Sequence, residues 1–192
     1  MKTIGAQVFE NCFELRDITL PNGLLSISYA AFQACSKLGS ISIPNSVTSV
    51  GESAFSGCSG MPSVTIGNGV SKISQLQFYG CSSLTTVVIP SGVTSIDGAA
   101  FQDCNSLVSV TIPEGVTDIK MYAFYNNENS SMTNLTLPQS IARIGDSALK
   151  CNSLTSVTFS GKDKATVQSM ANYSWELPSG CVLHCTDGDI TL

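Results

Sequence analysis

The feature that most constrains this chain is a 23-residue period in its apolar residues. The same phrase opens with a large aliphatic residue at Ile4, Ile27, Val50, Ile73, Ile96 and Ile119. A further copy begins at Ile144, two residues later than a strict period would place it. A fixed period of this length is typical of solenoids, in which each repeat is one coil and the stacked coils share a core.

Two further columns of the repeat predict what fills that core. A Phe lies five positions after the aliphatic residue, at Phe9, Phe32, Phe55, Phe78, Phe101 and Phe124. A Cys lies three positions later, at Cys12, Cys35, Cys58, Cys81 and Cys104, with Asn127 in the sixth copy and Cys151 in the seventh. Stacking should therefore produce a spine of Phe rings and a line of thiols. Free Cys behaves as a small buried hydrophobe, so we expect these thiols to be buried and unpaired.

The remaining columns predict the path of one coil. Alternating apolar and hydroxyl residues indicate half-buried strands near Ser40–Ile43, Ser63–Ile66, Thr86–Ile89 and Ser109–Ile112. Pro113-Glu114-Gly115 then fits a turn, with Pro second and Gly fourth. Tyr122-Ala123-Phe124 and its equivalents are interpreted as one helical turn that drives Phe into the core. Each coil should thus have three sides and contribute one strand to a parallel β-sheet.

The repeat pattern, I-x-x-x-A-F-x-x-C-x-x-L-x-x-I-x-I-P-x-x-V, resembles the BspA-like leucine-rich repeats of bacterial surface proteins from Ile4 to about Phe159. The resemblance implies an α/β-type, right-handed and curved leucine-rich-repeat solenoid, mostly strand and loop with short helical turns. It also implies an extracellular or cell-surface location and no catalytic residues. Departures from the pattern are Gly67 for Pro, Asn127 for Cys and Leu149 for Phe.

The period divides the chain into two parts. Residues 1–159 should form about seven repeats, starting at 4, 27, 50, 73, 96, 119 and 144, and residues 160–192 a C-terminal cap. A helix over Lys162–Asn172, beginning at Ser160 or Gly161, should precede a hairpin that turns at Asp187-Gly188. Tyr173 and Trp175 should help to cover the last coil, because the end of a repeat array needs protection.

The N-terminal end shows no comparable cap, since Ile4 already opens a repeat. The first strand, around Asp17–Leu20, should therefore present an unpaired edge. These features predict a fragment cut inside a longer array, with an N-terminal face that is frayed or associates with a second copy.

Composition and spacing argue against several classes of function. Charged residues are only 12% of the chain, the net charge is −5, and no basic cluster could hold a nucleic acid. No apolar run approaches a membrane span, and no apolar signal-peptide core follows Met1. His184, the only histidine, should lie on the opposite strand face from Cys181 and Cys185, so we expect no metal site. Ser147 and Lys150 match the S-x-x-K pattern but occupy ordinary repeat columns. We expect no catalytic residue, metal or cofactor.

The outward strand columns are the candidate binding surface, an expected concave face of small hydroxyl side chains. Its members are Asp17, Thr19, Ser40, Ser42, Ser63, Thr65, Thr86, Val88, Ser109, Thr111, Asn134, Thr136, Ser156 and Thr158. Two interpretations stay open. The chain is either a non-catalytic interaction module that binds a host or microbial protein or glycan, or a structural spacer within a larger surface protein.

Overall fold

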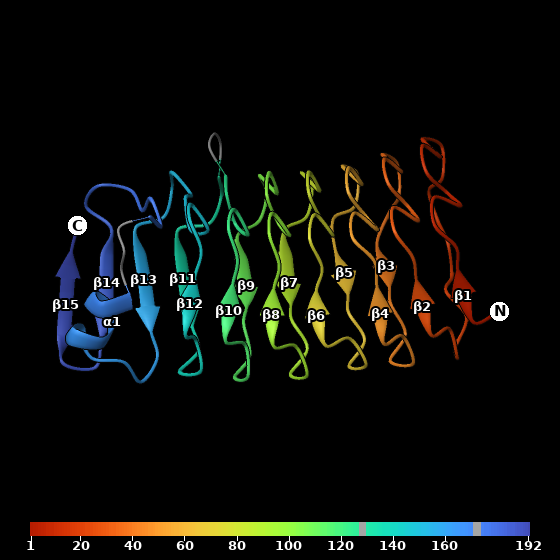
Figure 1. The fold of residues 1–192 in the computed structure, drawn as a ribbon. Coiled ribbons are helices and arrows are strands. Elements are labelled where there is room, and N and C mark those ends of the chain that lie inside the picture. Colours follow the sequence, from red (N-terminus) through yellow and green to blue (C-terminus); the bar gives the residue numbers. More distant parts are fainter. Residues whose placement is uncertain (127–129, 171–173) are drawn as a thin grey trace.

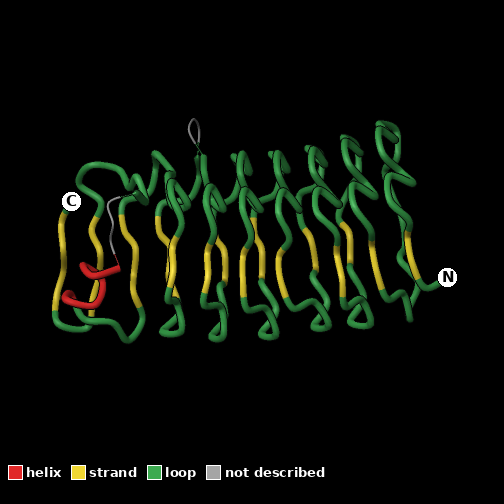
Figure 2. The backbone as a smooth tube through the Cα atoms, viewed as in Figure 1, coloured by secondary structure: helices red, strands yellow, loops and turns green. Residues whose placement is uncertain are grey.

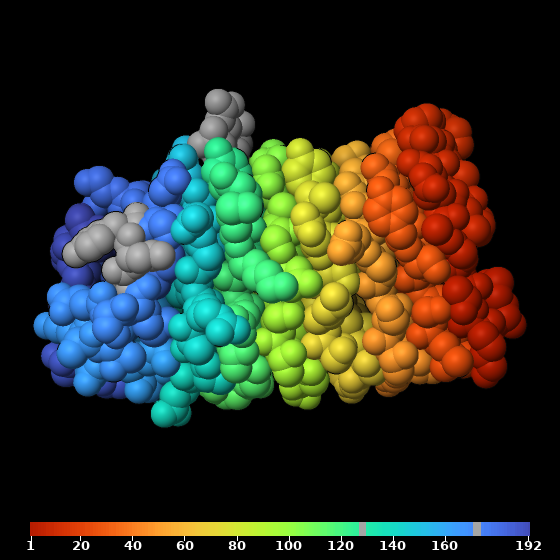
Figure 3. All heavy atoms as spheres, in the orientation of Figure 1, coloured from red at the N-terminus to blue at the C-terminus, as the bar shows by residue number. Residues whose placement is uncertain are grey.

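The computed structural model describes residues 1–126, 130–170 and 174–192 and shows a β-solenoid of about eight turns. Its coils stack in sequence order along one axis, so that the N- and C-termini lie at opposite ends (Figure 1). The space-filling view shows the coils as successive bands in the same order (Figure 3). The predicted repeat solenoid with parallel sheets is confirmed.

One side of the coils contains the predicted strands, and we call it the hydroxyl side after its exposed side chains. These strands are β3 (Ile41–Ser42), β5 (Val64–Thr65), β7 (Thr86–Val88), β9 (Ser109–Thr111), β11 (Asn134–Leu137) and β13 (Ser156–Phe159). They pair in parallel as β3 with β5, β7 with β9 and β11 with β13, for example with Thr86 opposite Ser109. Exposed and buried residues alternate along β7, β9 and β11, as the period of a strand requires.

A second side, which we call the charged side, also consists of short parallel strands. They are β1 (Thr3–Ile4), β2 (Ser26–Ile27), β4 (Ser49–Val50), β6 (Lys72–Ile73), β8 (Ser95–Ile96), β10 (Asp118–Ile119) and β12 (Arg143–Ile144). Each buries its aliphatic second residue and turns the first residue outward. Figure 2 shows that strands occupy only part of each coil and loops the rest.

The charged side is interrupted between β4 and β6. In the other coils the backbone N–H after the strand donates to the previous coil, as Asp97 N does to Ile73 O at 2.9 Å. At Ser74 this N–H donates instead to Oε1 of Gln77, and the Ser74 hydroxyl donates to Val50 O. Gln77 is fully buried in a column that holds Ala in most repeats, and its Nε2 has no partner among the described residues. The sheet is therefore divided by one buried amide.

On the third side, which we call the turn side, we predicted helical turns, and this prediction was wrong. Around Phe101 the chain forms successive turns, with Ala100 N donating to Asp97 O and Gln102 N to Ala99 O. Ala99 and Asp103 adopt left-handed conformations, with φ of 55° and 59°. This alternation aims the N–H groups of residues 99, 101 and 103 at carbonyls of the next coil. A helical turn would direct all of them along its own axis and leave these coil-to-coil hydrogen bonds unmade.

The core confirms the two predicted columns. Phe9, Phe32, Phe55, Phe78, Phe101 and Phe124 form a continuous stack with ring centroids 5.0–5.7 Å apart. All eight cysteines are free, and of the column cysteines only Cys12 is partly exposed. Each buried column thiol donates to the Phe carbonyl of the previous coil, as Cys58 does to Phe32 O at 3.2 Å. Burial raises the pKa of Cys58 and Cys151 to about 12. Asn127 lies outside the described residues.

The first coil departs from prediction at Asp17–Leu20, which form no strand. Among the described residues, one backbone hydrogen bond joins the next coil to the chain near this segment, from Gly39 N to Arg16 O. A groove of about 410 Å³ lies between Ile18–Leu20 and the residues around Ser40 and Ser42. Val8 and Phe13 of this coil are exposed. With a neighbouring coil on one side only, the segment has fewer partners to hold it in a strand.

The residues after β13 add one further turn to the solenoid. Helix α1 spans Lys164–Met170 and begins later than predicted, because the side chain of Asp163 accepts the N–H of Thr166 and caps it. Ala171, Asn172 and Tyr173 lie outside the described residues.

Strands β14 (Val182–Cys185) and β15 (Gly188–Thr191) form an antiparallel hairpin next to β13. Its two-residue turn is Thr186-Asp187, one residue earlier than predicted. Asp187 Oδ1 accepts the N–H of Lys164, which fixes the turn against the start of α1.

Trp175 covers the last core ring. Its indole is buried, stacks on Phe159 with centroids 5.7 Å apart, and donates from Nε1 to Ile144 O at 3.2 Å. A large aromatic side chain thus covers apolar surface that the next repeat would otherwise bury.

Candidate binding surface

The outward columns of the hydroxyl side all reach the surface. Twelve of the fourteen candidate residues are exposed, and Ser156 and Thr158 are half-buried. Some of the hydroxyls bond along the column, as Ser40 and Ser63 do at 2.7 Å. The side chains are short, so the face offers many hydrogen-bonding groups with little conformational entropy to lose on binding.

Two apolar residues interrupt this polar face. Val88 lies on β7 opposite Thr111, and Val108 immediately precedes β9; both are exposed. The candidate residues chosen from the sequence included Val88 but not Val108. Val108 occupies a column that holds Thr in three other repeats. Burying either side chain against a partner would contribute favourably, since transfer of apolar area stabilises a complex by about 25 cal/mol per Å².

A groove adjoins Val108. The ladder is open between β9 and β11, which belong to separate sheets. The space between them measures about 410 Å³ and is lined by Val108, Ser109, Thr111, Thr133, Asn134 and Thr136. The hydroxyl side therefore has one concave feature with an apolar rim in its C-terminal half.

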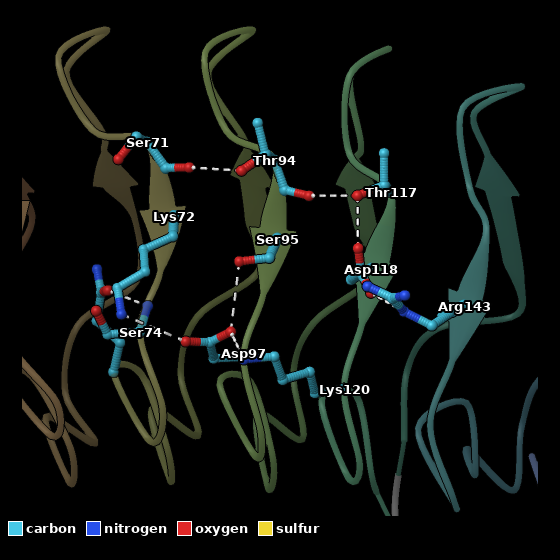
Figure 4. A network of polar contacts seen from close by, with 11 residues as sticks. Ser71, Lys72, Ser74, Thr94, Ser95, Asp97, Thr117, Asp118, Lys120 and Arg143 are labelled. Carbon is cyan, nitrogen blue, oxygen red and sulfur yellow. Dashed lines mark hydrogen bonds and ion pairs between the residues drawn. The ribbon is translucent and has the colours of Figure 1, made fainter.

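The charged side carries a network of ion pairs that sequence reasoning missed (Figure 4). Asp97 lies between two lysines from neighbouring coils, with its carboxylate oxygens 2.6 Å from Lys120 Nζ and 3.6 Å from Lys72 Nζ. The carboxylate itself is nearly buried, whereas both lysines are more than half exposed. The signal was present in the sequence, because Asp97 and Lys120 are separated by one period.

The same network continues through Asp118 and Arg143. The Thr117 hydroxyl donates to Asp118, and Arg143 Nε also donates to it; together they lower the pKa of that carboxyl. A groove of about 660 Å³ lies beside this pair, between β10, β12 and the end of α1. The positive and negative groups here largely neutralise one another, so the network has little net charge with which to attract a charged ligand. Its ion pairs join residues of neighbouring coils.

The possible catalytic and metal residues lie apart or are paired. Ser147 and Lys150 both donate to Glu176, at 2.6 and 2.7 Å, and this pairing raises the pKa of Lys150. Lys150 thus pairs with the Glu176 carboxylate in a partly exposed ion pair.

His184 Nδ1 pairs with Asp189 at 2.9 Å. Across the described ranges, no three His, Cys, Asp or Glu side chains are grouped as metal ligands would be. No helix in the described part of the chain is long and apolar enough to span a membrane.

Comparison with known families decides the identity of the repeat. The family described as BspA-type leucine-rich repeat region matches residues 2–129 and 72–177, with six copies. The chain belongs to this BspA-type leucine-rich repeat family. Structural neighbours of this family member are also described as leucine-rich repeat proteins. No curated protein matches the chain.

Several solved bacterial structures share this BspA-type fold. A leucine-rich repeat protein from Eubacterium ventriosum is 27% identical, with a TM-score of 0.73, over 98% of this chain and 45% of that one. One from Bacteroides ovatus is 26% identical, with a TM-score of 0.73, over 84% of this chain and 41% of that one. A leucine-rich cell surface protein from Faecalibacterium prausnitzii is 25% identical, with a TM-score of 0.58, over 82% and 57%. The chain therefore spans less than half the length of the first two.

Proposed function

We propose that this chain is a non-catalytic interaction module of a bacterial cell-surface or secreted protein, and that its hydroxyl side binds a protein partner. The observation that carries the proposal is the continuous exposed face of short side chains, with Val88 and Val108 as its apolar points. The surface location is supported by the family and by the neighbour described as a cell surface protein.

A protein partner is favoured over a glycan at this face by the kinds of side chain present. None of the fourteen candidate residues is aromatic, so no ring is available to stack on a sugar. Hydroxyls, small apolar groups and an open strand pair beside the 410 Å³ groove suit a polypeptide, which offers both backbone polar groups and apolar side chains. Few strong anchors are available, so each module should bind weakly and gain from several copies.

The test is a binding screen with matched surface variants. The chain is applied to an array of purified host extracellular proteins and to a glycan array. Thr86→Arg with Ser109→Arg places two long charged side chains on the hydroxyl side without touching the core. Ser49→Arg places the same side chain on the charged side and serves as the control, with circular dichroism checking the fold of each variant.

The proposal predicts a protein signal that the hydroxyl-side variant abolishes and the control retains. A protein signal that survives the hydroxyl-side variant would contradict it. A glycan signal that the hydroxyl-side variant abolishes, without any protein signal, would replace the proposed partner class. Silence on both arrays would favour the alternative, a spacer that positions other parts of a surface protein.

A further inference from the structure

A further concave site lies on the turn side, where the last repeats meet the segment after α1. Its hollow measures about 310 Å³ and is lined by Gln102, Tyr122, Tyr125, Ser147, Lys150 and Glu176. These residues come from three successive coils and from the aperiodic C-terminal segment. The hydroxyl side does not include any of them, so this site is independent of the proposed function.

The carboxylate of the site is fixed in place. Glu176 accepts hydrogen bonds from the Ser147 hydroxyl and from Lys150 Nζ, at 2.6 and 2.7 Å. Its backbone has a φ of 54°, the left-handed conformation that Ala99, Tyr122 and Ser147 also adopt in the turns of earlier coils.

The aromatic part of the site is also ordered. The Tyr122 and Tyr125 rings meet edge to face with centroids 5.4 Å apart, and Lys150 Nζ lies 5.5 Å from the centre of the Tyr125 ring. Tyr122 remains more than a third exposed. Neither tyrosine hydroxyl, nor the amide of Gln102, forms a hydrogen bond to another described residue. Three groups that can each donate and accept a hydrogen bond therefore remain available around one aromatic pair.

We propose that this hollow binds a neutral saccharide, with room for a single pyranose ring. A sugar needs donors and acceptors for its hydroxyls together with an aromatic face for its C–H groups, and the site offers phenols, an amide, a carboxylate and a tyrosine ring. Lys150 and Glu176 neutralise each other, so an anionic or cationic ligand would gain no net charge attraction. The volume lies at the lower end of ligand sites, which limits the buried part to one ring.

The repeat itself supplies substitutions that should preserve the fold. Tyr122 occupies a left-handed column where Ala30 and Ala99 adopt the same conformation, so Tyr122→Ala has precedent in two other coils. Gln102 shares its column with Ser56, which makes Gln102→Ser equally conservative. Tyr29→Ala removes an exposed tyrosine outside the hollow and is the matched control.

The experiment screens the full chain on an array of neutral and anionic glycans, followed by calorimetric titration with the methyl glycoside of the preferred terminal sugar. We expect Tyr122→Ala and Gln102→Ser each to weaken binding about tenfold, and Tyr29→Ala to leave it unchanged. Thr86→Arg with Ser109→Arg should also leave it unchanged, which separates this site from the hydroxyl side. Unaltered affinity in both site variants, a preference for anionic glycans, or no glycan binding at all would each overturn the assignment.

Discussion

Replacing Phe78 tests whether the stacked Phe column holds the solenoid together. The ring is fully buried and lies between Phe55 and Phe101, with centroids 5.7 and 5.4 Å away. Phe78→Ala removes a large buried side chain from the middle of the array and should lower the free energy of unfolding by about 3–5 kcal/mol.

Phe78→Leu separates ring stacking from burial. Leu149 already occupies this column in the seventh repeat and is fully buried there, so the coil accommodates Leu. The Leu variant loses chiefly two ring pairs, each worth about 0.5–1.5 kcal/mol, and should cost about 1–3 kcal/mol. Phe9→Ala should cost less than Phe78→Ala, because Phe9 is half-buried and stacks on Phe32 alone.

The assay is urea unfolding followed by circular dichroism, with the free energy of each variant taken at equal protein concentration. Phe78→Ala should lower the free energy of unfolding more than Phe78→Leu does, and more than Phe9→Ala does. A change of less than ~0.5 kcal/mol for Phe78→Ala, as for an ordinary surface substitution, would refute the spine as the main source of stability. Equal losses for Phe9→Ala and Phe78→Ala would refute the role of neighbouring coils.

Three further predictions concern buried groups. Gln77→Ala should raise the melting temperature, because it removes the unpaired Nε2 and allows Ser74 N to rejoin the ladder; a lower melting temperature would contradict this interpretation. Thiol titration of the native protein should find few reactive groups, and most of the eight after denaturation; full native labelling would exclude the buried thiol line. Stability should fall as the pH rises above 9. The unfolded state then loses the Cys58 proton, while the folded state keeps it until about pH 12. This thiol alone should account for about 1.4 kcal/mol per pH unit in that range, and Cys58→Ala should reduce the slope seen in urea titrations at pH 8 and 10.

The sequence was sufficient for the core columns and for the strands of the hydroxyl side. The Phe and Cys columns and the strands of the hydroxyl side follow from the period, because identical coils must stack identical columns. The left-handed turn residues could not be predicted. Positions such as Ala30, Leu76 and Tyr122 are not glycines, and only the hydrogen bonds to the next coil require their conformation.

Contacts that depart from the period could not be predicted either, because no repeat column indicates them. Gln77 interrupts a ladder through one side chain in a column of alanines, and no neighbour in the sequence indicates that its amide will capture the N–H of Ser74. Glu176 reaches Ser147 and Lys150 from an aperiodic segment, so no repeat column aligns them. The Asp97 network could have been found by comparing charges one period apart. Which exposed face binds a partner depends on the partner's surface as well as on these residues.

Hydrogen exchange with and without a protein selected on the array tests the central claim most directly, because it reports which face the partner covers. Binding at the hydroxyl side predicts slower exchange in β7 and β9, at Thr86–Val88 and Ser109–Thr111, with little change in β6, β8 and β10. Protection confined to the charged side or the turn side, or none in β7 and β9 at saturating partner, would contradict the account.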